Sequence, residues 1–220
     1  MDTDTNIEAT FCFIDIAGYT ALTDTHGEAA AADLMDDFSE LIRTAVEPLG
    51  HLQSLEGDCA FFVFSDPSVA LTALVALYRS VADRQNFPVV RAGLHHGPAL
   101  RRGGRYFGST VNMAARVAAQ ATGGQILCTK PVADMLERTA KPDIALTFQG
   151  EVSLKNLPVA VGVYEIALTG TTRSYVIDPV CKMQVDLRRA AGQLRVDGRS
   201  YWFCSLSCVE RFASQPASYT

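Results

Sequence analysis

Two aspartates stand at turns between segments rich in strand-forming residues. Asp15 follows the apolar run 11–14, and Asp58 lies between two further apolar runs, 51–55 and 59–64. If these strands share a sheet, both carboxylates emerge at the same edge. Mg²⁺ typically takes one or two carboxylates while substrate phosphates complete its shell, so the pair is a candidate divalent-cation site. The structural alternative is that Asp15 caps its turn and Asp58 stabilises a hairpin.

Asn112 and Arg116 are four residues apart in a segment of helical composition, 109–121. This spacing places an amide and a guanidinium on one helix face. An Arg with its fixed fork of donors suits the charge that builds up on a transferring phosphoryl group. The alternative is an ordinary polar pair on an exposed helix face.

Three cysteines gather near the C-terminus with the spacing C-x22-C-x3-C, namely Cys181, Cys204 and Cys208. Cys204 and Cys208 lie one helical turn apart, so their thiolates can converge on one ion. Three thiolates with one further ligand suit Zn²⁺ or Cu⁺. The alternative is three buried thiols in a small core. The remaining cysteines lie in apolar runs and are expected to be small buried hydrophobic residues: Cys12, Cys59 and Cys128.

A sheet with covering helices must position these side chains. Apolar runs and periodicity predict strands at 8–16, 51–55, 59–64, 87–94 and 125–129, with two more within 145–166. Helical spacing predicts helices at 27–46, 67–84, 109–121 and 131–138. The expected fold class is α/β with mixed strand directions over residues 1–168. A polar linker at 169–174 then leads to a small cysteine-rich domain at 175–220.

The composition narrows the function classes. The net charge is −5, the pI is about 5.3, and 48% of the residues are hydrophobic. An acidic chain without a basic stripe is not expected to bind nucleic acid. The polar, acidic N-terminus lacks the features of a secretory signal, and no run approaches a membrane span. We therefore expect a cytoplasmic protein with no membrane partner, whose cysteines are thiols or metal ligands rather than disulfides.

Five motifs together resemble the class III adenylate and guanylate cyclases, in the order in which that family carries them. They are Phe13-Ile-Asp-Ile-Ala-Gly-Tyr-Thr20, Leu55-Glu-Gly-Asp58, Val90-Arg-Ala-Gly-Leu-His-His-Gly97, Phe107-Gly-Ser-Thr-Val-Asn-Met-Ala-Ala-Arg116 and Leu154-Lys-Asn-Leu-Pro158. The resemblance covers residues 9–168. It implies a ferredoxin-like core that works as a head-to-tail homodimer on ATP or GTP.

The resemblance also implies a role for each matching position. Asp15 and Asp58 hold two Mg²⁺ or Mn²⁺ ions, the backbone of Ile16, Ala17 and Gly18 cradles the triphosphate, Arg91 and Lys155 contact phosphates, Asn112 positions the ribose, and Arg116 stabilises the transition state. One chain supplies the aspartates, and the other supplies Asn112 and Arg116. The implied reaction closes a 3′,5′-cyclic nucleotide and releases pyrophosphate.

The base-reading positions depart from the family. Ser54 and Arg105 stand where members that select adenine carry a Lys and an Asp or Thr. Arg offers only donors, so it cannot accept from the adenine amino group and suits guanine O6 or N7 better. The Glu of guanine-selective members is absent at Ser54. Two readings remain: a working cyclase, with ATP as the expected substrate and relaxed base choice, or a degenerate domain that binds nucleotide and supports a metal-sensing module.

The C-terminal segment resembles the YHS domain, which is akin to heavy-metal-sensing TRASH modules. The resemblance is carried by Asp178-Pro-Val-Cys-Lys-Met183 and Tyr201-Trp-Phe-Cys-Ser-Leu-Ser-Cys208, with Lys182 where the family usually has Gly. It implies metal binding. Because both modules share one chain, it also suggests that the metal regulates the cyclase.

Overall fold

A computed structural model describes residues 4–84, 86–139, 143–154, 159–169 and 175–220. Its strands are β1 Thr5–Ile16, β2 His51–Glu56, β3 Cys59–Phe64, β4 Val90–Arg102, β5 Arg105–Phe107, β6 Ile126–Thr129, β7 Ile144–Val152, β8 Val161–Leu168, β9 Tyr175–Ile177, β10 Gln184–Asp186, β11 Gly192–Val196 and β12 Arg199–Phe203. Its α-helices are α1 Tyr19–Leu41, α2 Pro67–Asp83, α3 Ser109–Gln120, α4 Lys130–Arg138 and α5 Leu206–Ser214. Within these ranges, none of the helices combines the length and apolar character needed to cross a membrane.

Eight strands of the described residues form one sheet in the order β2-β3-β1-β4-β6-β8-β7, with β5 paired to β4. Neighbours are antiparallel except β4 and β6, which run parallel. The long pairing of β1 with β4, from Thr5 opposite Arg101 to Ile16 opposite Val90, forms the centre of the sheet. The expected α/β fold with mixed strand directions is confirmed.

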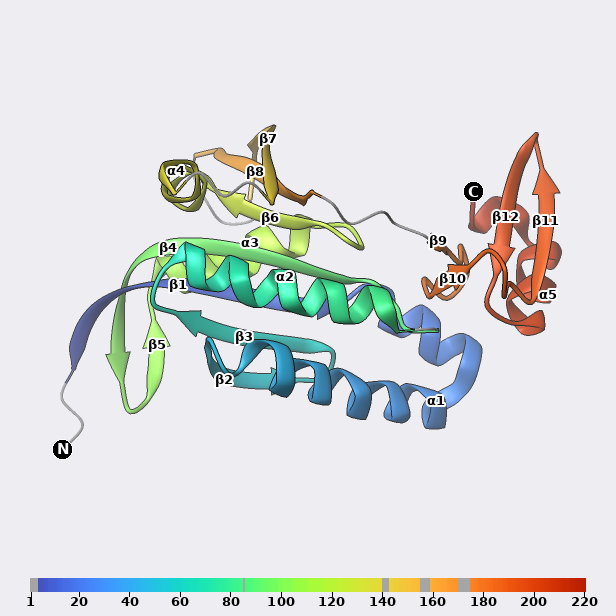
Figure 1. The fold of residues 1–220 in the computed structure, drawn as a ribbon, viewed down its shortest axis with the longest axis horizontal. Coiled ribbons are helices and arrows are strands. Elements are labelled where there is room, and N and C mark those ends of the chain that lie inside the picture. The colour runs from blue at the N-terminus through green and yellow to red at the C-terminus, as the bar shows by residue number, and fades with distance from the viewer. Residues whose placement is uncertain (1–3, 85, 140–142, 155–158, 170–174) are drawn as a thin grey trace.

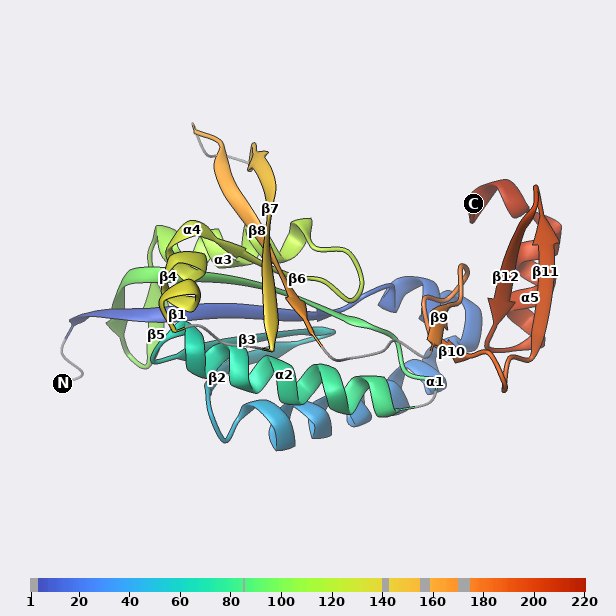
Figure 2. The same ribbon diagram turned by 45° about the horizontal axis from the view of Figure 1, so that its top comes forward.

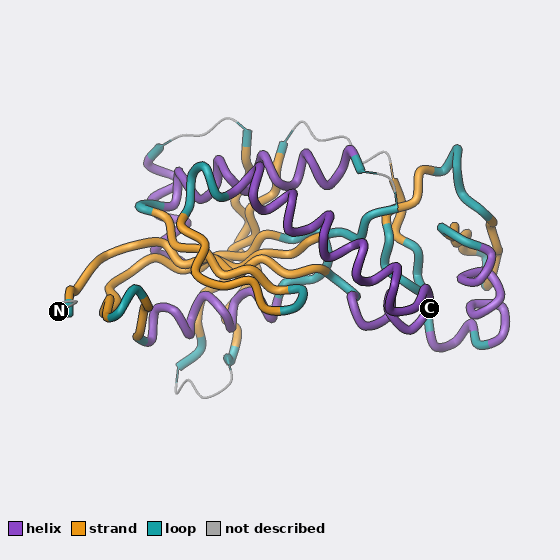
Figure 3. The backbone as a smooth tube through the Cα atoms, turned by 90° about the horizontal axis from the view of Figure 1, so that it is seen from below, coloured by secondary structure: helices purple, strands orange, loops and turns teal. Residues whose placement is uncertain are grey.

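Side-chain alternation along β1 divides the core between the two faces of the sheet. Cys12, Ile14 and Ile16 pack with residues of α1, α2 and α4, whereas Phe11 and Phe13 belong to the cluster that α3 covers. Figure 3 shows helices on both faces of the sheet. We call the second face the α3 face. Asp15 lies on the α3 face, because it alternates with the buried residues on either side.

Helix α3 crosses β4 at Gly93, where the backbones approach closely. A Cβ on Gly93 would lie 2.1 Å from the backbone nitrogen of Ala118. The missing side chain therefore lets α3 rest directly on the strand. This contact sets the depth at which α3 holds Asn112 and Arg116 on the α3 face.

Helix α1 begins earlier than periodicity predicts. The expected helix was 27–46, but α1 starts at Tyr19 and is interrupted at Gly27, whose φ of 84° and ψ of 170° are not helical. Thr23 and Thr25 donate to the carbonyls four residues earlier and so support the additional turns. The apolar spacing that revealed the helix belongs only to the part after Gly27, which packs on the core.

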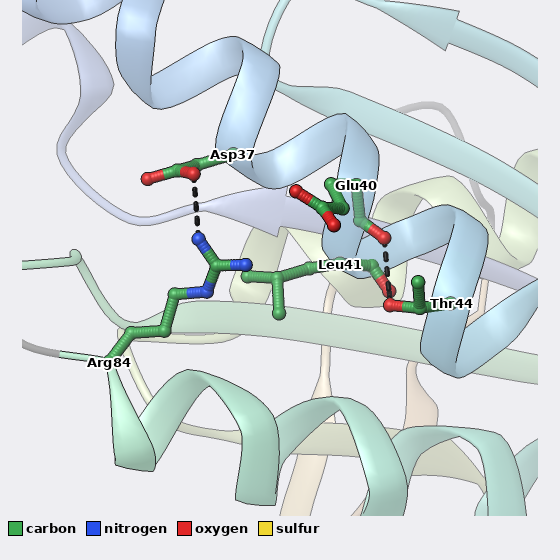
Figure 4. A network of polar contacts seen from close by, with 5 residues as sticks. All are labelled: Asp37, Glu40, Leu41, Thr44 and Arg84. Carbon is green, nitrogen blue, oxygen red and sulfur yellow. Dashed lines mark hydrogen bonds and ion pairs between the residues drawn. The ribbon is translucent and has the colours of Figure 1, made fainter.

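The C-terminal end of α1 widens into the π-helical turn Ile42–Val46. There, Thr44 Oγ1 donates to the Glu40 carbonyl at 2.8 Å (Figure 4). Arg84, at the end of α2, donates to Asp37 Oδ1 on α1 at 2.6 Å in the same view. The Arg84–Asp37 bond links the two long helices on one face of the sheet.

Strand β4 continues to Arg102 and does not stop at residue 94. The more polar second half of β4 pairs with the first half of β1. Backbone pairing therefore extends the strand beyond the apolar run that predicted it. Gly103 and Gly104 then form a two-residue turn with φ of 57° and 71°, which closes the hairpin with β5.

The C-terminal module comprises β9 to β12, α5 and a 3₁₀ turn, Pro216–Ser218. Its core contains Val180, Phe203, Phe212 and the two buried cysteines Cys181 and Cys208. Figures 1 and 2 show this module at the end of the large sheet, beside the first turns of α1. The linker prediction, 169–174, lies outside the described residues except for its first position, and the domain boundaries stay predictions.

Residues 183–184 connect the C-terminal module to the large α/β domain. Met183 forms a β-bridge with Pro88, and the Gln184 backbone N–H donates to the Phe87 carbonyl at 3.1 Å. The Gln184 side-chain amide donates to the carbonyls of Val81 and Phe87, each at 3.2 Å. The module is therefore seated on the end of α2 and the chain that leads into β4.

His95 gives the sheet a pH-sensitive element. It lies in β4, its Nδ1 is 2.6 Å from Thr129 Oγ1, and burial, with a contribution from His96, lowers the pKa of His95 from 6.5 to about 4. Between these values the unfolded chain binds a proton that the folded chain does not. The free energy of unfolding therefore falls as the pH falls from 6.5 to about 4.

We expect His95→Gln, which keeps a hydrogen-bonding group but cannot be protonated, to flatten this part of the stability curve. Urea unfolding between pH 7 and 4 measures the effect, with exposed His51→Gln as the matched control. An unchanged slope in the His95 variant would assign the acid sensitivity to other groups.

Candidate active site and metal cluster

Asp15 and Arg91 form a cross-strand pair on the α3 face. They are register partners in β1 and β4, and Arg91 Nε donates to Asp15 Oδ2 at 2.8 Å, with a second bond from Nη2. Arg91 Nη1 also donates to the Ala121 carbonyl at 3.1 Å, just beyond the end of α3. The phosphate contact that the family resemblance implies for Arg91 stays a prediction. In this structure its guanidinium pairs with the candidate metal ligand Asp15.

Asp58 occupies the tip of the β2–β3 hairpin, as predicted. Its carbonyl accepts from Ile16 N–H at 3.1 Å, which holds the tip against the end of β1. Burial and the charge of Asp15 raise the pKa of the Asp58 carboxyl. Two adjacent carboxylates that repel each other fit a hard divalent cation, which would relieve both desolvation and repulsion.

Cys59 borders this pair and corrects an expectation. It is half-buried and lies opposite Asp15, unlike the fully buried Cys12 and Cys128. Burial, together with Asp15 and Asp58, raises the pKa of the Cys59 thiol to about 11. The thiol is therefore protonated at neutral pH and a poor nucleophile.

The turn expected to cradle a triphosphate has only part of its N–H groups available. Ile16 N–H donates to Asp58, and Ala17 N–H donates to Val89 at 2.9 Å, so neither points to a ligand here. Gly18, with φ of 82°, is the N-cap residue of α1. Its carbonyl accepts the first bond of the helix, from Leu22 N–H at 3.0 Å. The N–H groups between Gly18 and Leu22 precede that bond and are the ones a helix start offers to an anion.

Asn112 and Arg116 lie on α3, with Asn112 exposed and Arg116 half-buried. Asp15 is nearest the C-terminal end of α3, because Arg91 bonds to both Asp15 and the Ala121 carbonyl. From Asn112 to Ala121 the helix axis rises roughly 13 Å. One chain therefore does not bring the carboxylates and Asn112 together.

The two positions expected to read the base lie on different strands. Ser54 is opposite Phe61 across β2 and β3, whereas exposed Arg105 begins β5 and alternates with Tyr106 along that strand. Phe11 contacts Phe61 with ring centres 6.3 Å apart and Tyr106 with ring centres 5.7 Å apart. Lys155, the other expected phosphate contact, lies outside the described residues.

The three C-terminal cysteines converge, together with a histidine that sequence analysis did not single out. Cys204 Sγ lies 3.3 Å from Cys181 Sγ and 3.7 Å from Cys208 Sγ. His26 Nε2, from α1, lies 3.7 Å from both Cys204 Sγ and Cys208 Sγ. All four ligand atoms are within 4.8 Å of one another, so they can hold one ion. A lone His beside Gly27 gives no signal of this role in the sequence.

Asp178 organises the loops that carry the cysteines. It is fully buried, and its Oδ1 accepts from the backbone N–H of Val180 at 2.8 Å and of Cys181 at 3.4 Å. Its Oδ2 accepts from Cys204 N–H at 2.8 Å. Ser205 caps α5 by accepting from Cys208 N–H at 3.3 Å. Backbone hydrogen bonds therefore set the positions of all three sulfur-bearing residues.

Comparison with solved structures gives the class of fold. The adenylyl cyclase CyaB from Pseudomonas aeruginosa matches 78% of this chain and 98% of its own, with 21% identity and a TM-score of 0.64. An adenylate/guanylate cyclase/hydrolase from Silicibacter pomeroyi matches 75% of this chain and 99% of its own, with 20% identity and a TM-score of 0.65. The expected ferredoxin-like cyclase fold is confirmed.

The family follows from the sequence comparisons. The model of the adenylate and guanylate cyclase catalytic domain matches residues 1–179, and that of the YHS domain matches residues 176–220. The chain therefore belongs to the adenylate and guanylate cyclase catalytic-domain family, with a YHS domain at its C-terminal end.

Two curated relatives each match about three quarters of this chain. An uncharacterized protein of Mycobacterium bovis is 34% identical over 75% of this chain and 43% of its own length. A pH-sensitive adenylate cyclase of Mycobacterium tuberculosis is 29% identical over 76% of this chain and 42% of its own length. The chain thus spans less than half the length of these curated relatives.

Proposed function

We propose that this protein is a nucleotidyl cyclase that converts a purine nucleoside triphosphate, ATP in the first place, into the 3′,5′-cyclic nucleotide and pyrophosphate at a homodimer interface. The observation that carries the proposal is the division of the site along α3. Asp15 and Asp58 meet near the C-terminal end of α3, whereas Asn112 lies in its first turn and Arg116 near its middle. A second copy in head-to-tail orientation would bring the two halves together.

The α3 face also has the surface that such a dimer needs. Phe13 and Phe61 stack on it with ring centres 4.5 Å apart, and both remain half-exposed in the single chain. Exposed aromatic residues beside a candidate site are typical of surfaces that a partner covers.

In the proposed reaction the ribose 3′-oxygen attacks the α-phosphorus, the bond from that phosphorus to pyrophosphate breaks, and the hydroxyl proton is lost. Divalent cations held by Asp15 and Asp58 would lower the pKa of the hydroxyl and neutralise phosphate charge. Arg116 would stabilise the charge that builds up on the α-phosphoryl oxygens, and Asn112 would orient the ribose. Arg91 would share Asp15 with the cations.

The test of the proposal is a product assay on ATP and GTP side by side, with Mn²⁺ or Mg²⁺ and with or without Zn²⁺. Cyclic nucleotide together with equimolar pyrophosphate supports a working cyclase. Nucleotide binding without either product would favour the other reading, a degenerate domain that serves as a scaffold for the metal-binding module. The Arg91–Asp15 pair is the observation that favours that alternative, because it occupies a metal ligand.

We expect base choice to be relaxed, because Ser54 and Arg105 replace the Lys and the Asp or Thr of members that select adenine. The double substitution Ser54→Lys with Arg105→Asp should raise the preference for ATP over GTP, by about 1–3 kcal/mol for one good bidentate contact. The ratio of kcat/KM values for the two nucleotides measures it, with each single substitution as a control. A strict ATP enzyme that the double change does not affect would place base reading elsewhere.

We also propose that the YHS domain binds a thiophilic ion through Cys181, Cys204 and Cys208, and that this ion regulates turnover. Support comes from a contact with the phosphate-binding turn. A Cβ on Gly18 would lie 2.5 Å from Lys182 Cγ, so the Lys182 side chain covers that turn. Lys182 has φ of 64°, which explains why Gly is usual at this position. Any shift of the module would change the space beside Gly18.

A further inference from the structure

The cysteine cluster gains a fourth ligand atom from the other domain. His26 belongs to α1, far from the cysteines in sequence, and its Nε2 lies 3.7 Å from Cys204 Sγ and from Cys208 Sγ. Cys181 and Cys208 are fully buried, while Cys204 and His26 are partly buried. The cluster therefore lies at the junction of the two domains and is largely shielded from solvent.

The spacing of these atoms fits one tetrahedral ion. With bonds of about 2.3 Å to sulfur and 2.0–2.1 Å to nitrogen, a tetrahedral Zn²⁺ ion separates two sulfurs by about 3.8 Å and a sulfur and a nitrogen by about 3.6 Å. The separations in the structure are 3.3 and 3.7 Å for two sulfur pairs and 3.7 Å for two sulfur–nitrogen pairs. Three thiolates and an imidazole form a complete structural zinc set, with no position left for a solvent ligand.

The local structure of α1 explains how His26 reaches the cluster. The helix is interrupted at Gly27, immediately after His26. Next to the break, Arg211 Nη2 from α5 donates to the Asp24 carbonyl at 2.5 Å. Because α5 also carries Cys208, the same helix both supports the break and supplies a ligand.

We propose that His26 is the fourth ligand of a single Zn²⁺-type ion, which thereby fastens the C-terminal domain to the first turns of α1, next to the phosphate-binding turn at Gly18. The inference rests on metal binding by the three cysteines, proposed above, and extends it across the domain boundary. An imidazole ligand favours tetrahedral Zn²⁺ over Cu⁺, which the three thiolates alone would accept. Metal loading then stiffens helix residues 19–26 as well as the module itself.

The first experiment measures metal affinity on the full chain with Co²⁺ and Zn²⁺ alone as probes. Co²⁺ reports its ligands through thiolate charge-transfer and ligand-field absorption, and Zn²⁺ competition gives the affinity. His26→Ala is expected to weaken Zn²⁺ binding by at least about tenfold, since loss of even an outer-shell partner costs about 10–100-fold. His26→Cys should restore tight binding with the spectrum of a four-thiolate site. Exposed His51→Ala is the matched control.

The second experiment uses hydrogen exchange to measure whether the ion holds the C-terminal domain against the first turns of α1. Zn²⁺ should slow exchange in residues 19–26 of the wild-type chain and leave that segment unchanged in His26→Ala, whereas residues 199–214 should still respond in the variant.

The outcomes distinguish ligation by His26 from metal binding by the three cysteines. No metal bound by the wild-type chain contradicts metal binding by the cysteines. Tight binding that His26→Ala leaves intact, with an unaltered Co²⁺ spectrum, keeps the cysteine site and overturns the role of His26. Equal protection of residues 19–26 in both chains overturns the fastening.

Discussion

Mixing the Asp58→Ala and Arg116→Ala variants is expected to restore cyclase activity that neither variant has alone. In the proposed dimer, each substitution would remove one half of a site that two chains share, so each homodimer would have two defective sites. In the mixed dimer both defects fall in one site, and the other site is intact. When equal amounts are mixed, about half of the dimers are heterodimers, and each has one working site of two. The expected activity is therefore roughly a quarter of that of the wild type.

The control for this experiment uses two substitutions on the same half of the site. Asp58→Ala mixed with Asp15→Ala should stay inactive, because every site of that heterodimer lacks one carboxylate. Differently tagged copies show whether subunits have exchanged. If exchange occurs and the first mixture still gives no product, the site is not shared between chains in the proposed way.

The large elements follow from sequence because hydrophobic periodicity records burial. Helices α2 and α3 and strand β3 begin and end close to their expected positions, since each carries an apolar face with clear end signals. The first turns of α1 were missed because they bury Leu22 but otherwise carry Thr, Asp and His in place of a continuous apolar stripe. The second half of β4 was missed because its pairing with β1 is a backbone effect, which leaves little trace in side-chain type.

The site residues were predictable by type but not by partner. The motifs placed Asp15 and Asp58 at adjacent turns, yet the ion pair of Asp15 with Arg91 depends on the register of β1 and β4. That register is set by twelve consecutive pairs and cannot be read from either strand alone. His26 illustrates the same limit, because 182 positions separate it from Cys208, and only the docking of the C-terminal domain makes them neighbours.

Asp178→Asn is expected to dismantle the cysteine site without disturbing the cyclase domain. The two side chains have nearly the same shape, but Asn replaces one acceptor oxygen with an NH₂ group. Either orientation turns this donor toward a backbone N–H that now donates to the carboxylate, at Val180 or at Cys204. Losing a hydrogen bond to a buried charge and leaving its donor unpaired costs about 1–3 kcal/mol. A domain with so small a core has little stability in reserve.

The measurements are Zn²⁺ affinity and limited proteolysis of the full chain. In Asp178→Asn we expect weaker Zn²⁺ binding and cleavage within residues 175–220, while the fragment that contains β1 to β8 resists. Asp186→Asn is the matched control, because its carboxylate accepts from Arg188 N–H at 2.9 Å near the surface of the same domain, where water can replace the lost acceptor. Unchanged affinity and cleavage in Asp178→Asn would mean that the ion alone, through its four ligands, holds the two cysteine loops in place.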